Sequence, residues 1–422
     1  MERFVGLIGI IIIFLIVFLM SNNRKAINYK TLGIGFALQW LLAIFIFKVP
    51  LGQKIFLCIG LFIKKILDFA VEGGVFVFGP LLHNNRLAEL FEHSGNIFAL
   101  QLICSMILMM VLVNILYYYG IMQRVVAILG KAMNTIMKVS GAEALSNVAS
   151  AFVGNVMAQI MIKPYMEKLT RSELLASLSG SLACVSGATI PIYIGMGINA
   201  EYVLASSVMA VPGALILAKI VYPETGEPET RDNIKISRRR TYTNIFEAIS
   251  NGASEGMKIA INIVAMLLAL VALVALIDWA LGLFGAFLYN YIPGCSHFAF
   301  LNELSLSYIL GKIFMWFALV IGVPLKDASI VGSLMGQKIV LNEMVAYTNL
   351  INVSSAITSK SFMLASFALC SFANFGSIAI QIGAIGELAP NQRKNIARLS
   401  LRALIIGTLS CYMSAAIVGI LM

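Results

Sequence analysis

The sequence predicts an all-α protein that crosses a membrane several times. Of its 422 residues, 60% are hydrophobic and only 12% are charged, against about a quarter in soluble domains. The apolar residues also form continuous runs of about 20, the length that a helix needs to span a bilayer. A β-barrel would instead show alternating segments of about ten residues. This composition excludes a soluble enzyme and a disordered chain.

The apolar runs divide the chain into three regions. Residues 1–90 hold two spans and an interfacial helix, which we expect to end at a turn at Gly73-Gly74. Residues 91–195 hold a span, an amphipathic helix, a hairpin and a broken helix. Residues 196–422 hold further spans, a second hairpin and a second broken helix. The expected spans and surface helices are residues 4–21, 31–49, 54–82, 97–119, 121–138, 202–221, 258–285, 308–323 and 403–421.

Two apolar segments of the middle region are interrupted. Residues 141–162 carry several small and polar side chains, so we expect two short helices that meet at a tip near Gly154. Residues 174–197 are predicted to break before Pro191, because a proline removes a backbone donor and clashes one turn back. Such breaks are tolerated at membrane depth where they line a cavity.

The last third repeats this order over residues 323–421, with a hairpin around Gly336 and a helix broken near Asn374. The distribution of Lys and Arg between the loops places both termini outside, and it requires both hairpins to be re-entrant from opposite faces. The chain is therefore predicted to be an inverted repeat. Paired broken helices of this kind mark the substrate site of transporters. The alternative is that glycine and proline merely kink packed helices.

The formal net charge of +10 is also explained by a membrane topology. Most of the excess lies in loops between spans, where it sets orientation in the lipid bilayer, so we expect no nucleic acid as a partner. The cysteines and histidines lack metal-ligand spacing, and the sequence contains no P-loop or HExxH motif. We therefore expect no enzymatic activity, no metal site and no organic cofactor.

Glu343 is the sharpest candidate for a functional residue, because a carboxylate inside an apolar stretch is costly and by default functional. Gln337 and Asn342 lie near it in the sequence, and Asn374 and Ser377 lie on the second broken helix. This set is rich in donors and acceptors and poor in charge, so it suits a neutral, polyhydroxylated ligand. The alternative is a structural hydrogen-bond cluster that holds helices together. Two aromatic residues, Tyr193 and Phe372, can stack on a ring or simply pack.

Several segments resemble the concentrative nucleoside transporters of the bacterial nucleoside permease type. The run from Gly336 to Tyr347, Gly-Gln-Lys-Ile-Val-Leu-Asn-Glu-Met-Val-Ala-Tyr, resembles a signature of that family. The resemblance covers nearly the whole chain and keeps the order and spacing of the elements. The other matching segments are residues 163–165, 170–174, 217–219, 222–225, 367–374, 388–393 and 397–399.

The resemblance implies about eight transmembrane helices, two opposed re-entrant hairpins, a homotrimer and an elevator-like movement of the hairpin-bearing domain. It also implies cation-driven uptake of nucleosides across a bacterial inner membrane. By position, Glu343 resembles the acid that binds the ribose hydroxyls, and Phe372 resembles a nearby aromatic residue. Asn374 and Ser377 resemble ribose-side and neighbouring contacts.

The first hairpin departs from the family pattern. Members that use sodium usually carry Gly-Gln-Thr-Glu at its tip, where this chain has Gly154-Asn155-Val156-Met157. Asn155 thus replaces a base-reading glutamine, and Met157 replaces a carboxylate whose acceptors it lacks. The positions that correspond to the cation site are Ser150, Val153, Ala188 and Thr189. The predicted substrate site consists of Glu343, Asn374, Ser377, Asn155, Gln337, Phe372, Val156 and Met157.

Cation-coupled secondary uptake of nucleosides is therefore the expected function, with Na⁺ or H⁺ as the coupling ion. The altered tip predicts altered base selectivity. Proton coupling through the remaining buried acid, with an unusual nucleoside such as pseudouridine as substrate, stays open as an alternative. A membrane sensor or structural protein that reuses the fold, and an ion channel or exchanger, are the alternatives from other functional classes.

Overall fold

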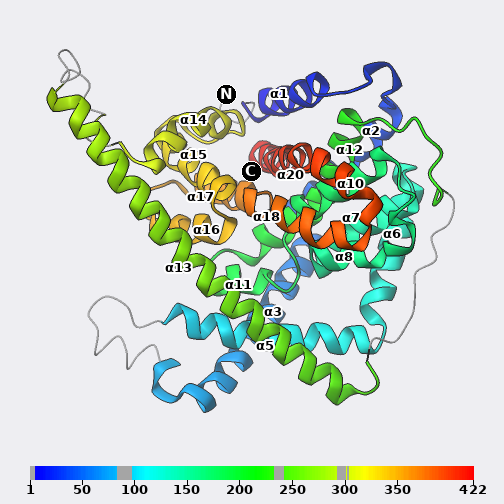
Figure 1. Cartoon of the computed structure of the whole chain (residues 1–422), viewed down its shortest axis with the longest axis horizontal. Coiled ribbons are helices and arrows are strands. Elements are labelled where there is room, and N and C mark those ends of the chain that lie inside the picture. Colours follow the sequence, from blue (N-terminus) through cyan, green and yellow to red (C-terminus); the bar gives the residue numbers. More distant parts are fainter. Residues whose placement is uncertain (1–4, 83–96, 232–241, 292–300, 302–303) are drawn as a thin grey trace.

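The structure of the chain is a computed structural model that describes residues 5–82, 97–231, 242–291, 301 and 304–422. All regular secondary structure within these ranges is helical (Figure 1). The predicted all-α class is therefore confirmed for the described part of the chain. The first region contains α1 (Val5–Leu19), α2 (Tyr29–Lys48) and α3 (Pro50–Phe78).

The turn expected at Gly73-Gly74 is wrong, because α3 runs through both glycines without interruption. A Cβ atom on Gly74 would lie 2.4 Å from the Cys104 sulfur, so this glycine permits close packing between helices. The helix ends at Gly79, whose φ of 58° lies in the left-handed region that favours glycine. The periodicity of the sequence does not distinguish these two uses of glycine.

Two successive stretches of the chain have the same order of elements. The first contains α5 (Phe98–Tyr118), α6 (Ile121–Met137), α7 (Gly141–Val153), α8 (Asn155–Met161), α9 (Lys163–Met166), α10 (Arg171–Ala183), α11 (Ile190–Gly195) and α12 (Ala200–Val221). The second contains α13 (Ile245–Tyr291), α14 (Leu306–Val320), α15 (Leu325–Val340), α16 (Glu343–Asn352), α17 (Ser359–Leu369), α18 (Phe375–Ile380), α19 (Gly386–Leu388) and α20 (Arg393–Leu421). In each stretch a pair of short helices precedes a helix broken in the middle, and a long helix follows.

The first pair of short helices meets at Gly154, as expected, where φ is 91°. The second pair, α15 and α16, forms a hairpin in the segment around Gly336, where one was expected. Gly336 lies inside α15, where a Cβ atom would be 2.6 Å from the Leu310 side chain of α14. The break falls at Leu341-Asn342, because the Asn342 side chain accepts from the backbone N–H of Val345 and starts α16 there.

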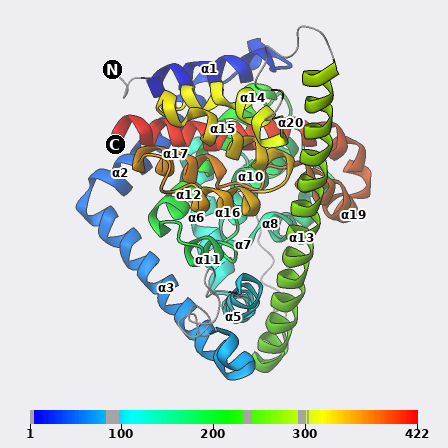
Figure 2. The ribbon, with the colours of Figure 1, turned by 90° about the vertical axis from the view of Figure 1, so that its left-hand side faces the viewer.

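The broken helices and the long helices that follow them form the buried centre of the molecule. In the most apolar 18-residue stretch of each helix, 89% of α12 and 83% of α20 is buried, whereas the same stretch of α13 is only 6% buried. The helix α10 packs on both α12 and α20, and α1 lies beside α20. By contrast, α13 packs mainly on α5, and Figure 2 shows α3 and α13 as long helices on opposite sides of the centre.

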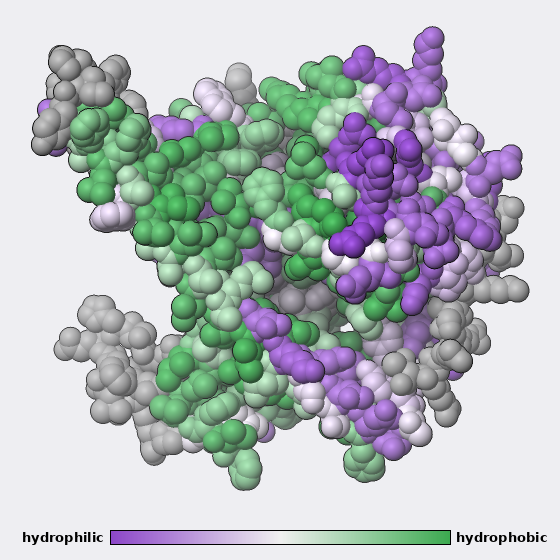
Figure 3. All heavy atoms as spheres, in the orientation of Figure 1, coloured by the Kyte–Doolittle hydropathy of each residue, from purple (hydrophilic) through white to green (hydrophobic). Residues whose placement is uncertain are grey.

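Five helices among the described residues are long and apolar enough to cross a membrane: α2, α5, α12, α13 and α20. The pair α14 and α15, bent by 117°, passes the same test together. Apolar side chains cover α14 and the neighbouring upper part of α13, while hydrophilic ones cover the lower part of α13 and gather on the opposite side (Figure 3). The total of about eight spans and the re-entrance of the hairpins remain predictions.

Candidate functional site

Glu343 joins the two broken helices through its carboxylate. It is the first residue of α16 and is 7% exposed. Its Oε1 atom accepts a hydrogen bond of 3.1 Å from the hydroxyl of Tyr193 on α11. Its Oε2 atom accepts one of 3.3 Å from the side-chain amide of Asn374, directly before α18. The buried acid therefore connects the second hairpin to the second half of each broken helix.

Asn374 is held in one orientation by its own helix. Its Oδ1 atom accepts a 2.8 Å bond from the backbone N–H of Ser377, which makes it the N-cap of α18. The amide nitrogen is thereby directed to Glu343, since the two ends of the amide have opposite hydrogen-bonding roles. Ser377 is buried in the first turn of α18. Phe372, which is half-buried, precedes this cap and accepts a 2.9 Å bond from the backbone N–H of Asn374.

Tyr193 contributes a hydroxyl as well as the ring that the sequence singled out. Its ring packs on Tyr347 with the centroids 4.7 Å apart, and Tyr347 donates to the Ser366 carbonyl at 2.8 Å. Both tyrosines are fully buried. Sequence reasoning missed Tyr347, and it did not assign the hydroxyl of Tyr193 to Glu343, because 150 residues separate the two partners.

Gln337 lies among the residues that join the hairpin to α14, and it is not bonded to Glu343. Its amide nitrogen donates to Ser307 at 3.0 Å and to Ser333 at 3.2 Å, and its oxygen accepts from Asn349 at 2.7 Å. These bonds engage both ends of the amide. Here the structural alternative, a hydrogen-bond cluster between helices, describes the geometry.

The tip of the first hairpin is held mainly through the backbone. The N–H of Gly187, in the break between α10 and α11, donates to the Phe152 carbonyl at 3.1 Å. The Asn155 side chain accepts from the adjacent N–H of Val156 at 2.7 Å. Val156 is half-buried, and the side chain of Met157 is exposed. The tip thus presents one short amide and two apolar side chains.

The positions that correspond to a cation site offer hydroxyl and carbonyl oxygens, the ligand type that hard cations prefer. The Ser150 hydroxyl donates to the Ser146 carbonyl at 2.7 Å, and the Thr189 hydroxyl donates to the Ser186 carbonyl at 2.9 Å. Val153 and Ala188 are half-buried and contribute only backbone oxygens. Within the described ranges, no cluster of His, Cys, Asp and Glu residues forms a metal site.

Three sequence models of known protein families match the chain. The C-terminal model of the Na⁺ dependent nucleoside transporters matches residues 202–419, and the N-terminal model matches residues 8–81. A model described as nucleoside recognition, or Gate, matches residues 99–200. Together they cover both broken helices and both hairpins.

Similar proteins match over nearly their whole length. An uncharacterized transporter of Bacillus subtilis, YutK, is 38% identical over 98% of both chains. The nucleoside permease NupC of Helicobacter pylori is 36% identical, over 98% of this chain and 97% of its own. The solved structure of CNTnw in an inward-facing, substrate-bound state is 36% identical, covers 100% of this chain and 98% of its own, and superimposes with a TM-score of 0.91. These similar proteins are transporters and permeases rather than enzymes, and the chain belongs to the concentrative nucleoside transporter family.

Proposed function

We propose that this protein takes up nucleosides by cation-coupled secondary transport and that Glu343 binds the ribose hydroxyls. The supporting observation is the placement of its carboxylate between Tyr193 and Asn374. Each carboxylate oxygen of Glu343 has two lone pairs and accepts one side-chain hydrogen bond here, so acceptor capacity remains. Vicinal hydroxyls are donors that a carboxylate binds strongly, because charge-assisted hydrogen bonds are stronger than neutral ones.

The first hairpin supplies the base side of the proposed site. Asn155 has a shorter amide than glutamine, and Met157 supplies neither a donor nor a carboxylate acceptor. A base that is read through several hydrogen bonds therefore loses partners at this tip. We infer a base selectivity different from that of members with a Gly-Gln-Thr-Glu tip, and pseudouridine belongs in the substrate panel.

The proposed movement is an elevator, in which the body that holds Glu343 slides against α5 and α13. These two helices pack closely on each other, since a Cβ atom on Gly252 or Gly256 of α13 would lie within 2.7 Å of the α5 backbone. Asn114 of α5 also donates to Glu255 at 3.0 Å. The similar protein CNTnw has been solved in inward-facing, outward-facing and intermediate states, which supports such a movement here.

We further propose a homotrimer in a bacterial inner membrane with both termini outside. The apolar side chains that α13 exposes support either a partner subunit or lipid at this face, and they include Leu268, Val271, Leu276, Trp279 and Leu283. Crosslinking of purified protein in lipid nanodiscs tests the trimer. A purely monomeric product would refute it.

The decisive experiment is uptake of labelled uridine, adenosine and pseudouridine into proteoliposomes. Accumulation above the external concentration is expected, and failure to accumulate any nucleoside under either ion gradient would refute active transport. Glu343→Gln is expected to abolish uptake of ribonucleosides, because the amide loses the negative charge and half of the acceptors. Glu387→Gln, the same change at an exposed acid, is the matched control and should transport normally.

Sodium is the coupling ion of the matched family, and the hydroxyls of Ser150 and Thr189 supply oxygens at the corresponding positions. Proton coupling is the second candidate, because Met157 leaves Glu343 as the acid of the proposed site. Imposing a sodium gradient and a proton gradient separately distinguishes the two. A strict sodium requirement supports the first, and sodium-independent uptake that a protonophore abolishes supports the second.

A further inference from the structure

Lys338 is a fully buried lysine next to the proposed site, with an exposed fraction of 0%. It lies in the last turn of α15, and its ammonium donates to the Thr408 hydroxyl of α20 at 3.4 Å. Lysines are almost never fully buried unless they are paired. In the described ranges, the ion pairs within 4 Å join residues between 143 and 229, so Lys338 has no carboxylate at that distance.

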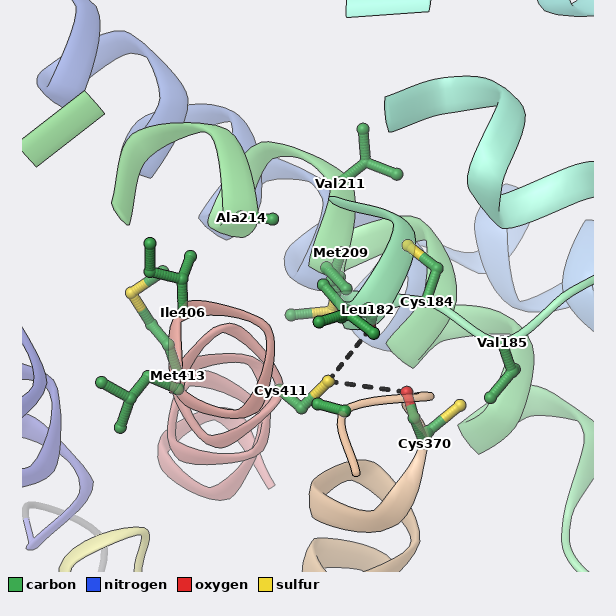
Figure 4. Close-up of a cluster of buried hydrophobic side chains, with 14 of the residues drawn as sticks. Leu182, Cys184, Val185, Met209, Val211, Ala214, Cys370, Ile406, Cys411 and Met413 are labelled. Carbon is green, nitrogen blue, oxygen red and sulfur yellow. Dashed lines mark hydrogen bonds between the residues drawn. The ribbon is translucent and has the colours of Figure 1, made fainter. Parts of the chain in front are cut away.

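The first halves of the two broken helices, α10 and α17, end beside the turn of α20 that contacts Lys338. The thiol of Cys411, one turn after Thr408, donates to the Ala183 carbonyl at 3.2 Å and to the Cys370 carbonyl at 3.5 Å (Figure 4). Ala183 is the last residue of α10, and Cys370 is the C-cap of α17. The C-terminal end of each first half-helix therefore converges on one turn of α20.

Helix C-termini attract positive charge. Their unpaired carbonyls carry roughly half an elementary negative charge, and in transporters such half-helix ends are used to bind the coupling cation. Lys338 also lies at the C-terminal end of its own helix, α15. The ammonium of Lys338 and the ends of α10 and α17 thus bond to adjacent positions of α20, Thr408 and Cys411, which are both buried.

Glu343 is the opposite charge nearest to Lys338 in the sequence. At a spacing of five residues the two would not face each other on a continuous helix. The chain turns at Leu341-Asn342, however, so Lys338 at the end of α15 and Glu343 at the start of α16 flank the same hairpin tip. Charges in a low-dielectric interior interact over longer distances than charges in water.

We propose that Lys338 is a built-in cation of the substrate site, a positioning residue that balances the carboxylate of Glu343 and the ends of α10 and α17. It would keep the empty site charge-balanced without a bound external cation. This inference rests on the proposed role of Glu343, but it concerns the stability of the site and not transport. The competing explanation is that Lys338 only anchors α15 to α20 through Thr408.

A double-mutant cycle in thermal unfolding separates the two explanations. The variants are Lys338→Met, Glu343→Gln and their combination, purified without substrate. Removing one charge of a buried pair leaves the other uncompensated, whereas removing both does not. We therefore expect each single variant to lower the Tm, and the combined variant to unfold no lower than Lys338→Met alone.

A second cycle, with Thr408→Val in place of Glu343→Gln, tests the anchor. The proposal is overturned if the decreases in Tm caused by Lys338→Met and Glu343→Gln are additive, while those caused by Lys338→Met and Thr408→Val are not. If Lys338→Met alone does not fold, recovery of folded protein in the combination with Glu343→Gln supports the proposal, and recovery only with Thr408→Val refutes it. Lys326→Met, at an exposed lysine of the same helix, is the control and should leave the Tm unchanged.

The outcome is distinguishable from a failure of the proposed function. Normal uridine uptake by Glu343→Gln would remove the ribose role of that acid, yet the thermal cycle would still report whether the two charges are coupled. Conversely, additivity in the cycle would overturn the inference about Lys338 and leave the ribose role of Glu343 standing.

Discussion

The two broken helices have the same place in the chain order but are held by different chemistry. In the first, the break between α10 and α11 meets the tip of its hairpin through a backbone bond, from Gly187 to Phe152. In the second, the side chain of Asn374 starts α18 and also binds Glu343 on the second hairpin. The first break is thus close-packed, and the second is a network of polar side chains.

This difference shows how the two halves can divide the work of recognition. A buried polar network is costly to disturb, because each partner left unpaired loses its hydrogen bond without regaining water. The second half is therefore suited to the constant part of a nucleoside, its ribose. At the first tip the Met157 side chain is exposed, so that tip can change without unpairing a buried group and is suited to the variable base.

The largest change in KM is expected from Asn374→Ala, which removes the side chain at the centre of the second network. It removes the cap of α18 and a bond to a charged group, together roughly 2–4 kcal/mol. We expect the KM for uridine to rise by about two orders of magnitude, measured as uptake by proteoliposomes. Asn199→Ala removes the N-cap of α12 instead, and its KM should be unchanged. Equal losses in both variants would show that capping alone matters.

Gly187→Ala tests whether the first break depends on close packing. A Cβ atom there would lie 2.6 Å from the Phe152 carbonyl oxygen, so the tip must move, at a cost of about 1–3 kcal/mol in unfolding free energy. Thermal unfolding of the purified protein measures this. Gly383→Ala, where a Cβ atom meets nothing within 4 Å, is the control. An unchanged Tm for Gly187→Ala would contradict the backbone contact.

Tyr193→Phe isolates a single hydrogen bond that links the first broken helix to Glu343. The ring stays on Tyr347, and only the hydroxyl that donates to the carboxylate is lost, which corresponds to about 1.5 kcal/mol. Close to a tenfold rise in the KM for uridine is expected. Tyr347→Phe loses a hydroxyl bonded to the Ser366 carbonyl and should change the Tm rather than the KM. The reverse pattern would assign the substrate role to Tyr347.

The smallest effect on stability is expected from Met157→Gln at the first tip. This side chain is 44% exposed, so the change in unfolding free energy should stay within about 0.5 kcal/mol. The ratio of uridine to adenosine uptake should nevertheless change several-fold, since a donor and an acceptor are added beside the base. Ile160→Gln, 42% exposed on the same helix, is the matched control. An unchanged ratio in both variants would remove the first tip from base recognition.

Where a helix breaks was more predictable than what each polar residue does. The tip at Gly154 and the break near Asn374 could be predicted, because glycine and helix-capping residues act locally. The turn expected at Gly73-Gly74 was wrong, because both glycines lie inside α3 and Gly74 permits a close helix–helix contact. The partners of Gln337 could not be predicted, since its amide is bonded to Ser307, Ser333 and Asn349 from three different helices.

The sequence by itself determined the membrane class, the repeated order of elements and the single most informative acid, Glu343. Hydropathy, helix breaks and the cost of a buried charge can all be read from a short window of residues. Only the tertiary structure decided the partners of that acid. Tyr193 is 150 residues before it and Asn374 is 31 residues after it. Contacts over such separations depend on how whole helices pack, and no local pattern encodes them.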